Sequence, residues 1–296
     1  LDFEITRDKI PIYSVDVSYM ISPELGYIKI NRFAANTYKE FISASKKLLG
    51  NGMKKLVLDL RNNPGGYLGA AINISNEFLD DDLLIVYTKD RLGNKEEYYS
   101  NQKGLLLNTP VIVIIDEGSA SASEIVAGAL QDNDKGTIVG RRSFGKGLVQ
   151  EQFEYSDGSA YRITTQRYYT PTGRCIQRPY SKGKGDDYTS ELMDRINSGE
   201  LINKDSIEFN DSLKFITPKG KIVYGGGGIM PDTFIPLDTN TFHPAISEAI
   251  RKDLIRQFAF DYTNKYRAEL ESQELSNFIK FFELNTNDLK ILETYF

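Results

Sequence analysis

Two apolar runs, each followed by a short turn and a helical segment, constrain the fold of this chain most. The first is KKLVLDL at 54–60, followed by the turn RNNPGG and the segment YLGAAINISNEFL. The second is PVIVIID at 110–116, followed by the turn EGSASAS and the segment EIVAGALQDN. Continuous apolar strands are typical of parallel sheets that are buried on both faces. This order of elements predicts an α/β fold with a parallel sheet.

Weaker patterns add elements around this core. Alternating residues predict strands at 3–15 and 25–33, and helical spacing predicts a helix that starts at Asn36 or Thr37 and ends at 51–52. The run 83–90 repeats the strand pattern, and short strands are predicted at 136–140, 150–155 and 160–169. Residues 180–222 are polar and irregular, with one short helix at 190–199, which indicates a surface insertion. From Pro244 onward the pattern is helical.

Composition excludes several classes of protein. The 296 residues carry a net charge of −5, which argues against a general nucleic-acid surface. No apolar run reaches the roughly 20 residues that a membrane-spanning helix needs. The single cysteine, Cys175, excludes an internal disulfide framework, and no CxxC pair suggests zinc. The glycine run at 225–228 precedes a proline and a strand rather than a helix, which argues against a phosphate loop. We therefore expect neither a cofactor nor a metal.

The two turns that follow the apolar runs carry the residues best suited to chemistry. Three alternate serines at 119–123 could serve packing and capping, or one of them could be a nucleophile. A serine at a helix start lies at the positive end of the helix dipole, where free N–H groups can hold an oxyanion. Gly65 and Gly66 can direct further N–H groups to the same sheet edge, where ligands of open α/β sheets bind. A serine and two backbone donors suit acyl transfer.

A base for such a serine has to be histidine or lysine. The one histidine, His243, precedes Pro244 at a predicted helix start, which favours a capping or surface role. Lys146 lies between Gly145 and Gly147, so it can approach the backbone closely and be shielded from water. Because burial disfavours the charged ammonium, an enclosed Lys146 could accept the serine proton. The alternative is a flexible loop with an exposed lysine.

Four ordered motifs narrow these possibilities. LVLDLRNNPGG, GSASASEIVAGAL, SFGKGLVQ and RYYTPTGRCIQ together resemble the carboxy-terminal processing peptidases, or tail-specific proteases, of serine peptidase family S41. The resemblance runs from about Leu1 to Asp238 and is interrupted by the insertion after Pro179. It implies a serine endopeptidase that cleaves proteins at or near their C-terminal tails through an acyl-enzyme. It also implies a crotonase/ClpP-like ββα core with a parallel sheet, added β-strands and a C-terminal helical segment.

The same resemblance implies individual roles, because all four motifs are intact. The nucleophile, the general base and the residue that orients the base would be Ser121, Lys146 and Gln150. The backbone donors to the oxyanion would be Ala122 and either Gly66 or Gly65. We then expect Ser119 to shape its turn and Ser123 to cap or line the first turn of the helix.

A domain organisation follows from the resemblance. Residues 1–16 would be the end of a PDZ-type domain and its linker, 17–243 the protease core, and 244–296 the helical segment. The family normally carries a PDZ domain before the core, which captures the substrate tail by strand addition. Since the chain begins without an initiator Met or a signal peptide, we expect it to be a fragment of a longer protein that contains this domain.

Partners and location are further expectations. The resemblance implies unfolded or tail-exposed protein substrates, and the aromatic residues of the C-terminal helices suggest a homo-oligomer formed through them. GGGGIMPDTFIPLD at 225–238 resembles the versions found in Gram-negative bacteria, which implies a periplasmic or envelope location.

Two other functions compete with the peptidase. A crotonase-like acyl-CoA enzyme would need a carboxylate near the glycine turn, and it would not need Lys146. Glu77 and Asp80 lie on the adjacent predicted helix, but solvation of a helix surface explains them more simply. A non-catalytic peptide-binding scaffold would retain the fold without needing the intact serine, lysine and glutamine.

Overall fold

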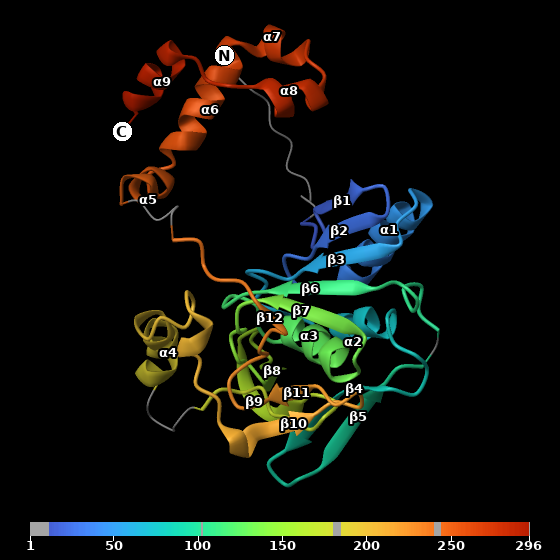
Figure 1. Cartoon of the computed structure of the whole chain (residues 1–296). Coiled ribbons are helices and arrows are strands. Elements are labelled where there is room, and N and C mark those ends of the chain that lie inside the picture. The colour runs from blue at the N-terminus through green and yellow to red at the C-terminus, as the bar shows by residue number, and fades with distance from the viewer. Residues whose placement is uncertain (1–11, 102, 180–184, 240–243, 296) are drawn as a thin grey trace. The chain divides into compact units, whose positions relative to one another are not determined.

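The computed structural model describes residues 12–101, 103–179, 185–239 and 244–295, and the chain divides into two compact units at Pro236 and Leu237 (Figure 1). The first unit contains the sheets, and the second is helical. Residues 1–11 of the predicted PDZ-type strand, and His243, lie outside the described residues. None of the described helices is long and apolar enough to span a membrane.

The first unit is built on a six-stranded sheet with the order β1-β2-β3-β6-β7-β12. Its strands are β1 (Val17–Ser22), β2 (Leu25–Lys29), β3 (Lys55–Asp59), β6 (Val111–Ile115), β7 (Gly136–Gly140) and β12 (Thr233–Phe234). β1 pairs with β2 in antiparallel orientation, and every other pairing in this sheet is parallel. The predicted α/β fold with a parallel sheet is confirmed.

Three helices cover one face of this sheet: α1 (Thr37–Gly50), α2 (Leu68–Asn76) and α3 (Ala122–Asp132). Leu56 and Leu58 of β3 are 1% and 0% exposed, and each such side chain contributes about 1.5–3 kcal/mol through burial. The alternate residues of β6 point outward instead, and Ile112 is 42% exposed. Burial of both faces was therefore a wrong prediction, because in the described part of the first unit these helices pack on one face.

A second sheet of four antiparallel strands has the order β5-β4-β9-β8. Its strands are β4 (Leu84–Asp90), β5 (Lys95–Tyr99), β8 (Leu148–Glu154) and β9 (Ala160–Tyr169). The run 83–90 repeats the strand pattern in the sequence, but it is not followed by a helix, because the Asp90 carboxylate accepts hydrogen bonds from the N–H groups of Leu92 and Asn94. This turn returns the chain immediately as an antiparallel hairpin. Figure 1 shows α2 and α3 between the two sheets.

The segment after β9 contains α4 (Gly185–Asn197), two short 3-10 turns at Lys204–Ser206 and Asp211–Leu213, and the hairpin β10 (Lys214–Ile216) with β11 (Ile222–Tyr224). It is not purely a surface insertion, because Arg195 and Glu200 are 4% and 6% exposed. The glycine run donates to backbone carbonyls, with Gly226 N 2.6 Å from Cys175 O and Gly228 N 2.8 Å from Ile176 O. These N–H groups are therefore engaged within the protein.

The second unit contains α5 (Pro244–Arg251), α6 (Leu254–Lys265), α7 (Arg267–Glu271), α8 (Leu275–Phe281) and α9 (Thr286–Glu293). Aromatic side chains join α6 to the later helices. The Tyr262 ring contacts Phe282 edge-on with centroids 5.9 Å apart, and Phe258 contacts Tyr295 edge-on at 5.8 Å. Of these four residues Phe258 is buried and belongs to the core of this unit, whereas Phe282 is 39% exposed.

Candidate active site

The turns after β3 and β6 are joined by their own side chains and backbone. The Ser119 hydroxyl donates to Leu60 O at 2.8 Å, and the Ser123 hydroxyl donates to Asn63 O at 3.0 Å. Ser119 also accepts from Asp116 N at 2.9 Å, so it shapes the turn as expected. Ser123 does not cap its own helix but binds the neighbouring turn. Two of the three serines therefore hold the strand ends together and are completely buried.

Ser121 differs from both, because it lines a cavity and has an unusual backbone. It is the N-cap residue of α3, with φ 56° and ψ −113°. A residue with a side chain rarely adopts a positive φ, and such strain costs about 1–3 kcal/mol that the surroundings must offset. The Ser121 N–H donates to Glu124 Oε2 at 2.8 Å, one of the contacts that hold this conformation. Strain of this kind is concentrated at functional sites.

The glycine turn lies directly against this serine. A Cβ atom on Gly65 would be 2.6 Å from Ser121 Cβ, and one on Gly66 would be 1.9 Å from Phe33 O. Only glycine fits either position. The Gly65 N–H donates to Asn63 Oδ1 at 2.9 Å. Among the described residues, the N–H groups of Gly66 and Ala122 have no hydrogen-bond partner.

The loop that carries Lys146 is held by its backbone. Gly145 N and Lys146 N donate to the two oxygens of Glu124 at 2.7 and 2.8 Å. Phe144 N donates to Ser119 O at 2.9 Å, and the Tyr168 hydroxyl donates to Lys146 O. The loop is therefore bonded to both the serine turn and β9. A flexible loop with a fully exposed lysine does not describe it, because Lys146 is half-buried.

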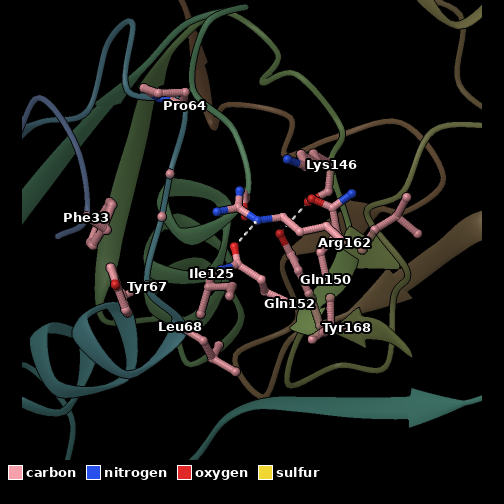
Figure 2. A pocket seen from close by; sticks show the side chains of 15 residues that line it. Phe33, Pro64, Tyr67, Leu68, Ile125, Lys146, Gln150, Gln152, Arg162 and Tyr168 are labelled. Carbon is pink, nitrogen blue, oxygen red and sulfur yellow. Dashed lines mark hydrogen bonds between the residues drawn. The ribbon is translucent and has the colours of Figure 1, made fainter. Parts of the chain in front are cut away.

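A cavity of about 630 Å³ brings the predicted residues together. Ser121, Lys146 and Gln150 line it, and Figure 2 shows Lys146 and Gln150 across the cavity from Phe33 and Tyr67. A β-bulge between Val149 and Gln150 interrupts the pairing of β8 with β9, and bulges often redirect side chains near active sites. No hydrogen bond joins the Lys146 ammonium to Ser121 or Gln150 in the described part of the chain.

Glu124 was missed in the sequence analysis, although its carboxylate joins the serine turn to the Lys146 loop. It is fully buried, and besides the three N–H groups named above it accepts from the Ser143 hydroxyl at 2.5 Å. Burial raises the pKa of its carboxyl above the ordinary value, and the hydrogen bonds oppose that shift. The available signal was its position three residues after the N-cap serine, where an acid often caps a helix.

A second overlooked acid supports the glycine turn. Asp59 is completely buried at the end of β3 and accepts from Arg61 Nη2 and from the Tyr27 hydroxyl, each at 2.6 Å. Burial alone would raise the pKa of Asp59, but the hydrogen bonds from Arg61 and Tyr27 hold it below its ordinary value. Burial and the same carboxylate raise the pKa of Tyr27 to about 12. The hydrogen bonds of Asp59 with Arg61 and Tyr27 fix the start of the turn that leads to Gly65.

The sequence model for Peptidase family S41 matches residues 24–188, more than half of the chain. This chain belongs to peptidase family S41. A carboxyl-terminal-processing protease of Synechocystis sp. is 43% identical over 180 residues, which are 60% of this chain and 42% of that protein. A probable CtpA-like serine protease of Staphylococcus aureus is 33% identical over 287 residues, 96% of this chain and 54% of that protein.

A solved structure, the photosystem II D1 C-terminal processing protease, matches with 36% identity and a TM-score of 0.51 over 58% of this chain and 47% of that one. This S41 chain thus spans about half the length of the relatives that it matches. Bacterial carboxyl-terminal-processing proteases are among them, and Gram-positive Staphylococcus is represented. The comparisons therefore do not support a restriction to Gram-negative bacteria.

Glu77, considered above for acyl-CoA chemistry, is not a solvated helix residue in this S41 fold. It is 4% exposed and accepts from the Tyr38 hydroxyl and from Leu105 N, each at 2.6 Å. It does not line the cavity, and neither does any other acidic residue of the described chain. The described residues also contain no cluster of three or more His, Cys, Asp or Glu side chains that could hold a metal ion.

Proposed function

We propose that this chain is the core of a serine endopeptidase that cleaves proteins at or near their C-terminal tails through an acyl-enzyme. Family membership and the names of the relatives support this reaction class. One observation carries the assignment to residues: Ser121, on a strained backbone at a helix start, shares a cavity with Lys146 and lies beside two unpartnered N–H groups. In this proposal the core has the crotonase/ClpP-like ββα arrangement.

The proposed chemistry begins with proton transfer from the Ser121 hydroxyl to an uncharged Lys146. Ser121 Oγ then bonds to the scissile carbonyl carbon, and the N–H groups of Ala122 and Gly66 stabilise the oxyanion. Lys146 gives its proton to the leaving amine as the peptide bond breaks, which leaves the acyl group on Ser121. A water molecule releases this acyl group, with Lys146 again as the base.

The proposal narrows the choice of oxyanion donor and keeps the role that the resemblance implied for Gln150. Gly66 is preferred over Gly65 as the donor, because the Gly65 N–H is already bonded to Asn63. Gln150 is assigned to orient the lysine by accepting an amine hydrogen from it. Catalytic hydrogen bonds are often longer in a free enzyme and shorten when substrate binds, so we assign the contacts among Ser121, Lys146 and Gln150 to the substrate complex.

The biological setting is part of the same proposal. Its substrates would be unfolded proteins or proteins with exposed tails, captured by a PDZ domain elsewhere in the full-length protein. The helices of the second unit would form a homo-oligomer, and the protein would act outside the cytoplasm.

The test combines a covalent probe with peptide analysis. A serine-directed fluorophosphonate should label the wild-type chain and Ser119→Ala but not Ser121→Ala, since only Ser121 faces the cavity. Lys146→Ala and Lys146→Arg should remain folded and label slowly, because neither provides a neutral amine. When an unfolded protein is the substrate, mass spectrometry should find released peptides with the wild type and with Ser119→Ala, but not with Ser121→Ala. Labelling without cleavage would favour an acyl-CoA enzyme. The absence of both labelling and cleavage would favour a non-catalytic scaffold.

A further inference from the structure

The loop that carries Lys146 is bound by a residue from beyond the family match, which ends at residue 188. Arg195 of α4 donates from Nη2 to Arg142 O at 2.7 Å and from Nη1 to Ser143 O at 3.1 Å. Its side chain is 4% exposed. A planar guanidinium can reach two neighbouring carbonyls at once, so this contact fixes both the position and the direction of the peptide between them.

Glu200 holds this arginine in place. Its Oε1 accepts from Arg195 Nε at 3.0 Å and from Arg142 Nε at 2.6 Å, and its Oε2 accepts from Arg142 Nη2 at 2.5 Å. The carboxylate is 7% exposed and lies between two guanidinium groups. Removal of one partner from a buried ion pair leaves an uncompensated charge, so the three side chains act as a unit.

The contact with Ser143 leads directly to the catalytic residues. The Ser143 hydroxyl donates to Glu124 Oε1 at 2.5 Å and accepts from Ile229 N at 2.6 Å. The other oxygen of Glu124 accepts from both Ser121 N and Lys146 N, each at 2.8 Å. Movement of the Ser143 backbone would therefore shift the Glu124 carboxylate, and this carboxylate holds the backbone of Ser121 and of Lys146 in place.

We propose that Arg195, held by Glu200, is a positioning residue for Lys146, and this rests on the proposed role of Lys146 as the base. Without the two hydrogen bonds from Arg195, the carbonyls of residues 142 and 143 lose their partners and the loop relaxes toward solvent. The substrate-facing wall formed by Phe33 and Tyr67 belongs to other segments and stays in place. Loss of Arg195 should therefore reduce kcat and leave KM nearly unchanged.

The experiment compares Arg195→Gln and Glu200→Gln with Arg141→Gln as the matched control. Arg141 forms a similar part-buried pair with Glu117 at 2.7 Å, one residue before the loop segment, and its side chain does not donate to the loop carbonyls. We expect both test variants to lose about tenfold to a hundredfold in kcat, with KM within about threefold of wild type. Arg141→Gln should change neither.

A second measurement separates the loop from the chemistry. Amide hydrogen exchange at residues 143–147 should accelerate in Arg195→Gln and not in Arg141→Gln. If Arg195→Gln does not fold, Arg195→Lys carries the test: it keeps the charge beside Glu200, but one ammonium does not span both carbonyls, so an intermediate kcat is expected.

Two results would overturn the inference: unchanged exchange in a folded Arg195→Gln protein, or faster exchange with a wild-type kcat and KM. A wild-type rate in Lys146→Ala would refute the proposed function instead. The exchange data would still decide whether Arg195 holds the loop.

Discussion

Replacement of Gly66 by alanine tests the geometry of the site most directly. The new methyl group would lie 1.9 Å from Phe33 O, and ordinary van der Waals contact requires a separation about 1.5 Å larger. The atom it meets belongs to the backbone, so no side-chain rotation relieves the contact. The φ angle of 145° is also one that residues with side chains rarely adopt. The turn has to move, and the Gly66 N–H moves with it.

The expected effect follows from the size of this movement. An oxyanion donor acts within about 2.7–3.1 Å of the oxyanion, so a shift of more than an ångström removes the hydrogen bond. Loss of one such donor typically lowers kcat by about 10²–10³, or about 2.7–4 kcal/mol. We expect Gly66→Ala to fall in this range, because the Ala122 N–H remains as the other donor, and we expect KM to change little.

Gly69→Ala is the matched control. Gly69 lies in α2, three residues along the chain, and a Cβ atom there would meet nothing within 4 Å. Alanine at a compatible helical position stabilises a protein by about 0.4–1 kcal/mol, so this variant should melt slightly higher and keep its activity. The assay is steady-state hydrolysis of an unfolded protein beside thermal unfolding followed by circular dichroism. A folded Gly66→Ala protein with more than a third of the wild-type kcat would refute the assignment of this N–H group.

Three further substitutions test other parts of the chain. Hydrogen bonds from Arg61 hold the pKa of Asp59 below its ordinary value. The Asp59 carboxylate therefore stabilises the fold fully at pH values above its unfolded-state pKa of about 3.9. This stabilisation is lost as the pH falls through the lower pKa of the folded state. Asp59→Asn should therefore unfold at less urea than wild type at pH ~7, with a smaller difference near pH ~3; equal differences would contradict the sign. Arg174→Ala should lower the free energy of unfolding by about 3–5 kcal/mol, because it leaves the fully buried Asp132 without its ion pair, and a loss below about 1 kcal/mol in urea titrations would contradict this. His243→Gln should keep nearly full peptidase activity, whereas a loss of about a hundredfold would identify the histidine as catalytic.

The parts of the structure that the sequence predicted are those set by local patterns. The apolar runs that became β3 and β6, and the helices after them, follow from hydrophobicity and turn residues over short stretches. The glycines of the first turn were also predictable, because a positive φ at Gly65 and Gly66 excludes most other residues. The structure brings Ser121 and Lys146 to one cavity, while their catalytic roles stay a prediction.

The parts that the sequence did not predict depend on partners far along the chain. An apolar run such as 83–90 shows that a strand is buried, but not which sheet it joins. Glu77 is the C-cap residue of α2 and Arg195 lies on α4, so the local pattern of both charged residues indicates solvent exposure. Their burial depends on Tyr38, 39 residues away, and on Ser143, 52 residues away. Such a contact becomes visible only when the backbone is placed.

These long separations also set an order in time for a chain made from its N-terminus. The Ser143 hydroxyl accepts from Ile229, 86 residues later, and its carbonyl accepts from Arg195, 52 residues later. A ribosome adds about 5–20 residues per second, so Ser121 leaves the exit tunnel several seconds before Ile229, the last of these partners. Until then the Lys146 loop lacks part of its support. The hydrogen bonds that hold Ser143 are therefore completed only after residue 229 has been added, late in the synthesis of this chain.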